Sequence, residues 1–149
     1  MSAKPDRMLL AAGSLSGLAA LLHLGCIAFG APWYRALGAG EGMARAAAAG
    51  HPRPTIMALV IASILALWAL YAFSAAGAMR RLPLTRTALS LITAVYLVRG
   101  VAAPAMTTLF PDRSLNFWIW SSAICLTIGV VHLIGLIQVW NRLGTSRAV

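Results

Sequence analysis

Arg99 is the residue of this sequence that makes the strongest chemical demand on its surroundings. It lies in AVYLVRGVAAP, residues 94–104, within an otherwise apolar run. An arginine at the centre of a bilayer costs about 2.5–3.5 kcal/mol on insertion scales, and it cannot avoid this cost by losing its proton. Its N–H groups therefore need acceptors, although the apolar segments contain no Asp or Glu. We expect these acceptors to be hydroxyl and carbonyl groups of the chain, or an anionic or carbonyl-bearing ligand.

Other side chains that exchange hydrogen bonds or protons are predicted at a similar depth. With a helix rise of about 1.5 Å per residue, His23 and Cys125 fall at nearly the level of Arg99, and Ser122 lies slightly farther out. We expect Arg99 to hold the head group of a ligand while His23 and Ser122 exchange hydrogen bonds with it. Glu41, in the loop that follows the first apolar segment, would close the site. The predicted ligand-binding residues are Arg99, His23, Ser122, Glu41, Tyr96 and Cys125.

The same residues argue against a metal or haem centre. His23, Cys26 and Cys125 include suitable zinc ligands, but a fourth ligand is missing. The charge of Arg99 at the same depth would also repel the cation. A haem between His23 and His132 suits a bundle of helices, but these histidines differ in depth by about 10 Å. We therefore expect no metal and no cofactor.

Two further classes of function stay open. In a membrane-embedded enzyme, Glu41 or His23 would act as the base while Arg99 holds the substrate anion. Ser122 beside His23 could serve as a nucleophile, but the sequence offers no third residue to orient the histidine. In a structural subunit, Arg99 would instead pair with an acid on a partner chain. The leading hypothesis is a protein that binds or transports a small amphipathic molecule, with lipids among the candidates, in an intramembrane polar pocket.

Four long apolar segments must position these side chains. The chain has 149 residues, of which 60% are hydrophobic and 10% charged, whereas soluble proteins have about 25% charged residues. Each segment exceeds the roughly 20 residues that a helix needs to cross a bilayer. The sequence thus predicts an all-α, polytopic membrane protein, a single domain formed by a four-helix transmembrane bundle. The predicted spans are residues 8–30, 55–79, 87–109 and 117–140.

The outer loop, residues 31–54, is long and has its own pattern. Trp33 and Tyr34 are of the kind that favours the membrane–water interface. The run GEGMARAAAAG contains good helix formers, and Glu41 precedes Arg45 by one helical turn, an arrangement that stabilises a helix. We expect a short interfacial helix here, with a disordered Ala-rich connector as the alternative.

The net charge of +9 is distributed as in a membrane protein. Seven basic residues flank the termini and the connection between the second and third spans, whereas the two other loops hold four. The positive-inside rule therefore places both termini in the cytoplasm. Since no basic face is left for nucleic acid, the expected partners are membrane lipids, and a homo-oligomer stays open.

The runs GAPWYRALGAGEGMA, ALWALYAFSAAG, AVYLVRG and FWIWSSAICLTIGVVHLIGL resemble those of uncharacterised small bacterial inner-membrane proteins with four transmembrane helices. The resemblance covers nearly the whole chain. It implies a multi-pass protein of a Gram-negative inner membrane with both termini inside, and it implies no particular activity. Membrane glutathione-transferase relatives do not fit, because residues 55–79 carry no charge. Quinone-coupled disulfide oxidases do not fit either, because the cysteine pairs that they need are missing.

Overall fold

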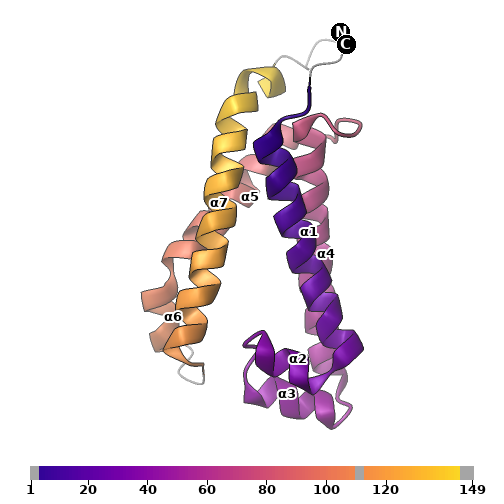
Figure 1. Cartoon of the computed structure of the whole chain (residues 1–149), viewed down its shortest axis with the longest axis vertical. Coiled ribbons are helices and arrows are strands. Elements are labelled where there is room, and N and C mark those ends of the chain that lie inside the picture. The colour runs from indigo at the N-terminus through magenta and orange to yellow at the C-terminus, as the bar shows by residue number, and fades with distance from the viewer. Residues whose placement is uncertain (1–3, 110–112, 145–149) are drawn as a thin grey trace.

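The computed structural model describes residues 4–109 and 113–144 of the chain (Figure 1). Every regular element in these ranges is an α-helix, as the sequence predicts. The helices are α1 (Arg7–Phe29), α2 (Ala31–Ala36), α3 (Glu41–Ala48), α4 (Pro52–Ala76), α5 (Thr85–Val101), α6 (Ala103–Leu109) and α7 (Leu115–Gly144).

Local signals in the sequence set several helix ends. The Asp6 carboxylate accepts a hydrogen bond of 3.0 Å from the Leu9 amide and so caps the start of α1. Pro52 stands in the first turn of α4, where its missing N–H is not needed. Gly77 ends α4 in the left-handed conformation, with φ +84°, which glycine adopts without steric cost.

The long helices form two pairs that meet at one end and diverge at the other (Figure 1). α1 runs along α4, and α5 runs along α7. The pairs join through a cluster of buried small and aliphatic side chains near the two termini. A Cβ atom at Gly135 of α7 would lie 2.6 Å from Leu9 Cγ of α1, so glycine permits this close approach. The cluster consists of Leu9, Ala12, Ala72, Ala75, Ala76, Leu89, Leu136 and Val139.

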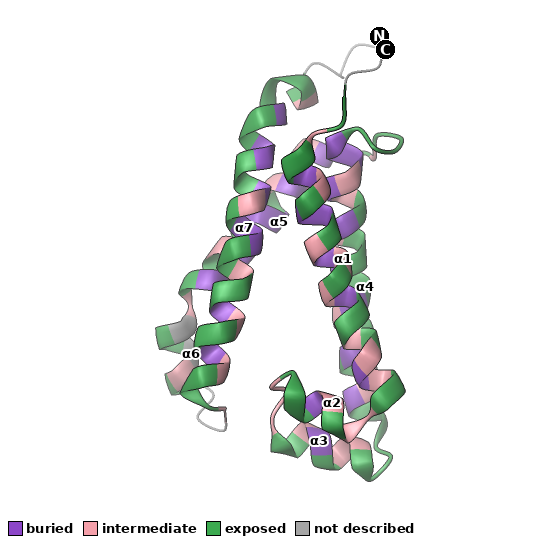
Figure 2. Cartoon of the chain, in the orientation of Figure 1, coloured by how far each residue is buried: buried purple, intermediate pink, exposed green. Residues whose placement is uncertain are grey.

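Three helices, α1, α4 and α7, are long and apolar enough to cross a membrane. Figure 2 shows that much of their outward surface is exposed, and large apolar side chains such as Trp120 (71% exposed) and Ile137 (67%) lie on it. Exposed apolar area of this extent needs an apolar medium or a partner to cover it.

The predicted span 87–109 is not one helix, and in this respect the prediction is wrong. α5 has 17 residues and ends at Val101, and α6 begins at Ala103. Pro104 lacks an N–H and so cannot donate to the Gly100 carbonyl four residues earlier, which accounts for the break at Ala102. The other three spans agree with α1, α4 and α7 to within a few residues.

The outer loop contains two short helices where the sequence predicted one. α3 matches the expected interfacial helix, while α2 follows α1 directly after Gly30. Both lie at the end of the molecule far from the termini (Figure 1). At the opposite end, the Asp6 carboxylate oxygen Oδ2 lies 3.8 Å from Arg142 Nη2. Arg81 donates a hydrogen bond of 2.7 Å to the Arg142 carbonyl. The start of α1, the end of α7 and the α4–α5 connection therefore share one end of the described part of the molecule.

Candidate functional site

Arg99 lies near the end of α5, against α7. Its guanidinium donates hydrogen bonds of 3.0 Å to Ser122 Oγ and 2.9 Å to Ser121 Oγ. The guanidinium carbon is 5.1 Å from the centroid of the Trp118 ring. These three α7 residues are spaced by three and four positions, so they share one helix face. The pairing of Arg99 with Ser122 is the part of the predicted cluster that the structure brings together.

Close packing of the two helices allows this contact. A Cβ atom at Gly100 would lie 2.7 Å from Leu126 Cα, so the α5 backbone comes very near α7 at this level. The serine hydroxyls orient their own hydrogens elsewhere: Ser122 toward the Arg99 carbonyl and Ser121 toward the Trp118 carbonyl, both at 3.4 Å. Their lone pairs are then free to accept from Arg99.

Arg113, just before α7, is a second cation at the same ring. Its guanidinium carbon lies 5.0 Å from the Phe117 ring centroid and 6.0 Å from that of Trp118. It donates one hydrogen bond of 3.2 Å, to the Gly38 carbonyl in the α2–α3 connection. Burial, together with the positive charge of Arg99, lowers the pKa of the Arg113 guanidinium from its ordinary value. Two guanidinium groups thus lie close enough to repel each other.

Sequence reasoning missed Arg113 because it counted the residue only as a loop charge. The available signal was its place five residues before Trp118, next to a helix start that also carries Phe117 and the serine pair.

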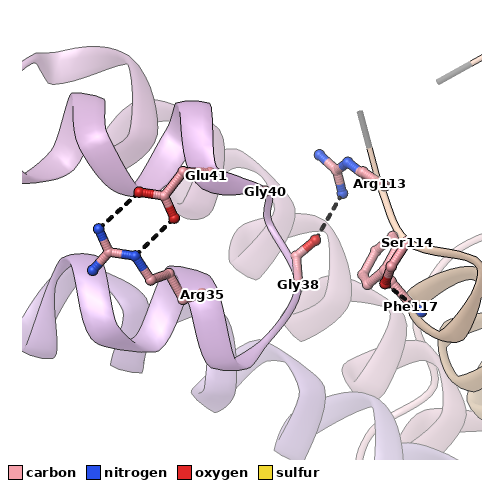
Figure 3. Close-up of a pocket in the computed structure, with 7 residues that line it drawn as sticks. All are labelled: Arg35, Gly38, Gly40, Glu41, Arg113, Ser114 and Phe117. Atoms are coloured by element: carbon pink, nitrogen blue, oxygen red, sulfur yellow. Dashed lines mark hydrogen bonds and ion pairs between the residues drawn. The ribbon is translucent and has the colours of Figure 1, made fainter. Parts of the chain in front are cut away.

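A cavity of about 280 Å³ opens beside Arg113 at the end of the molecule that holds α2 and α3 (Figure 3). It lies between the α2–α3 connection and the start of α7. The residues around it are Arg35, Gly38, Gly40, Glu41, Arg113, Ser114 and Phe117. Ser114 Oγ accepts a hydrogen bond of 3.2 Å from the Phe117 amide and so caps the start of α7.

Glu41 lines this cavity but does not close over Arg99. Its two carboxylate oxygens accept hydrogen bonds of 2.8 and 2.9 Å from the guanidinium of Arg35 (Figure 3). This bidentate pair also replaces the expected helix pair with Arg45, because α2 brings the planar fork of Arg35 alongside the start of α3. The hydrogen bond from Arg35 lowers the pKa of the Glu41 carboxyl. The prediction that Glu41 acts as a lid on Arg99 is therefore not supported by this geometry.

Among the described residues, none of the other predicted site residues is hydrogen-bonded to the Arg99 guanidinium. His23 Nδ1 is 2.8 Å from the Ala19 carbonyl of its own helix. Tyr96 is buried toward α1, where its hydroxyl lies 2.9 Å from Ser16 Oγ. Cys125 packs, partly buried, against the cluster that contains Tyr96. Depth placed His23 at the level of Arg99, but His23 lies on α1, which packs mainly against α4.

A second cavity, of about 330 Å³, lies where α1 ends beneath α3. Cys26, Tyr34 and His51 are among its lining residues, and no Arg, Lys, Asp or Glu lines it. The buried Tyr34 hydroxyl has no hydrogen-bond partner among the described residues. This cavity is suited to a neutral group, so the arginine-lined side of the molecule is the better candidate for an anion.

The carboxylates of the chain are largely committed elsewhere. Glu41 pairs with Arg35, and Asp6 caps α1 near Arg142, whereas Asp112 lies outside the described residues. Within the described ranges, neither Arg99 nor Arg113 pairs with a carboxylate. In the same ranges, no three His, Cys, Asp or Glu side chains are arranged to hold a metal ion. The arrangement that remains is a pair of arginines around Trp118, which is suited chemically to binding an anion.

Fold and site together define an all-α protein with three helices able to span a membrane and an arginine-rich site near one end of the bundle. No protein-family model matches the chain, and the searches of curated proteins and of solved structures find no match either.

Proposed function

We propose that this chain is a multi-pass membrane protein that binds or transports a small amphipathic molecule whose anionic or carbonyl group is held by Arg99. The observation that supports this proposal is the incomplete coordination of Arg99. Two of its five N–H groups bond to the described residues, both to serine hydroxyls. The other three have no acceptor among those residues, and a guanidinium at this depth strongly favours a ligand that supplies one.

The membrane setting has independent support. α1, α4 and α7 meet the length and hydropathy needed for spanning, and we propose that α5 and α6 together make the fourth passage. An even number of passages is consistent with the start of α1 and the end of α7 lying at one end of the molecule (Figure 1). The excess of basic residues at that end favours a cytoplasmic location for it. The sequence resemblance favours a bacterial inner membrane.

The enzymatic alternative has less support from the geometry. A general base must come within hydrogen-bond reach of the substrate that Arg99 would hold. His23 bonds to its own helix and Glu41 bonds to Arg35, so neither is aimed at Arg99. The alternative of a structural subunit, with Arg99 paired to an acid on a partner chain, makes a different prediction about the isolated protein and is separated by the experiment below.

Native mass spectrometry of protein gently extracted from its own membrane tests the proposal. We expect wild type to retain a bound small molecule, and Arg99→Ala to lose it while keeping its oligomeric state. Arg53→Ala, which removes an exposed charge at the start of α4, is the matched control and should retain the molecule. Bare wild-type protein would contradict the proposal. A partner subunit lost with Arg99→Ala would establish the structural alternative instead.

A further inference from the structure

We infer that Arg99 and Arg113 form a two-arginine clamp around Trp118 for a phosphate monoester group, reached from the outer cavity beside Gly38. This inference rests on the proposed function and adds a second anchor, a ligand class and a route. Arg113 is essential to it, because one arginine alone would serve a carboxylate or a carbonyl equally well.

The geometry brings two cations to one ring without a described counter-charge. Arg99 and Arg113 place their guanidinium carbons 5.1 and 6.0 Å from the Trp118 ring centroid. Arg113 has one hydrogen bond within the described residues, to the Gly38 carbonyl, and Arg99 has two, to hydroxyls. Neutral acceptors leave the mutual repulsion of the arginines uncompensated, so an anion between them would be favoured by both charges.

The number of free donors distinguishes phosphate from carboxylate. A carboxylate has two oxygens and one charge, which a single guanidinium fork can satisfy. A phosphate monoester carries a charge of about −1.5 to −2 near neutral pH and three strong acceptor oxygens. Together, the two guanidinium forks match that larger number of acceptors. The clamp therefore fits a phosphate group better than a carboxylate.

The outer cavity provides the route to the clamp. Arg113 lines this cavity and lies 6.0 Å from the Trp118 ring centroid. Its bond to Gly38 joins the segment before α7 to the α2–α3 connection (Figure 3). Glu41, the carboxylate that lines the cavity, is neutralised by its bidentate pair with Arg35. An anion that reaches Arg113 would replace the Gly38 carbonyl as acceptor and would thereby loosen this contact between the helix pairs.

Binding measurements on the full chain in detergent micelles test the clamp. The probes are lysophosphatidic acid, the fatty acid and the monoacylglycerol of the same chain length, and inorganic phosphate. We expect wild type to prefer lysophosphatidic acid to the fatty acid by about tenfold or more. Arg113→Ala should abolish this preference. Arg113→Lys, which keeps the charge but not the fork, should restore it only in part, and Arg53→Ala should leave it unchanged.

The outcomes separate the clamp from the proposed function. If Arg99→Ala abolishes lipid binding while Arg113→Ala keeps the preference for phosphate, the clamp is wrong and the proposed function stands. If wild type binds none of the four probes, the clamp is wrong, and the native mass spectrum decides the proposed function separately. Inorganic phosphate that binds as tightly as lysophosphatidic acid would support the clamp and identify free phosphate as its ligand, whereas preference for the lipid would identify a phospholipid head group. Circular dichroism and oligomeric mass identify any variant that fails to fold.

Discussion

At the end of the molecule that holds both termini, all four long helices pack through small and aliphatic side chains, whereas at the opposite end the two helix pairs separate (Figure 1). Leu9 packs against Gly135 at the first end. At the second, α7 meets the α2–α3 connection through Arg113 and Phe117, which contact Gly38. The first end is closed by contacts between small and aliphatic side chains, whereas the candidate site lies where arginine N–H groups have no acceptor among the described residues.

The largest expected effect comes from breaking the packed end. Gly135→Ala would place a Cβ atom 2.6 Å from Leu9 Cγ and 3.1 Å from the Leu9 backbone nitrogen, so α1 and α7 must move apart. We expect a loss of about 1–3 kcal/mol of stability, measured as a lower thermal midpoint in detergent. Gly42→Ala in α3 is the control, because no atom lies within 4 Å of its Cβ position, and its midpoint should not fall. Equal midpoints for wild type and Gly135→Ala would contradict the close packing.

The same change at the separated end should cost less. Gly38 has φ +74°, and a Cβ atom there would overlap the Phe117 ring. Phe117 is only half-buried and can turn away, so most of the cost is the backbone strain of roughly 1–2 kcal/mol for a left-handed residue. Gly40→Ala is matched, since Gly40 has φ +91° and nothing within 4 Å. The difference between the thermal midpoints of Gly38→Ala and Gly40→Ala measures the cost of the Phe117 contact. If Gly38→Ala is more destabilising than Gly135→Ala, the comparison between the two ends is reversed.

Replacing Arg99 separates a structural role from a ligand-binding one. Arg99→Leu removes a charge from an apolar setting, and the serine hydroxyls keep their hydrogen bonds to carbonyls. For ligand-free Arg99→Leu we expect a stability equal to that of wild type or higher by up to about 1 kcal/mol. Residues kept for function often lower the stability of the free protein. Thermal unfolding after delipidation measures this. A clear loss of stability in the variant would mean that the two serine bonds already make Arg99 a structural residue.

The apolar runs were sufficient to predict the helical class and most helix bounds, because a bilayer-spanning segment is encoded locally. The proximity of Arg99 and Ser122 was also predictable, since depth follows from counting residues along two helices. His23 shares that depth but lies on α1, which pairs mainly with α4. Depth carries no information about which helices are neighbours, so this part of the site could not be derived.

Two other features depended on non-local structure. The run around Pro104 is apolar throughout, so hydropathy did not reveal the break between α5 and α6. The Glu41–Arg35 pair required α2, a helix of six residues that the outer loop pattern did not predict. Short helices depend on tertiary packing rather than on intrinsic propensity, and the neighbours of a loop charge such as Arg113 depend on it as well.

The smallest expected effect is an acid-sensitive contribution from the separated end. The bond from Arg35, with a further contribution from the charge of Arg45, lowers the pKa of Glu41 in the folded protein. The stabilisation is therefore fully present above the unfolded-state pKa of about 4.3 and is lost as the pH falls through the lower folded-state value. Both side chains of the pair are about half exposed, so the effect should be small and weakened by salt.

Comparing wild type with Glu41→Gln isolates this contribution from the other carboxylates, which titrate in both proteins. The difference in thermal midpoint between wild type and Glu41→Gln should be constant near neutral pH. It should fall toward zero as the pH approaches 3, and it should be smaller in high salt. A difference that grows on acidification would show that the fold stabilises the protonated form of Glu41 and that Arg35 is not its main partner. Because Gly135 and Leu9 carry no titratable group, Gly135→Ala should lower the midpoint by a similar amount across the same range, which confines the pH response to the separated end.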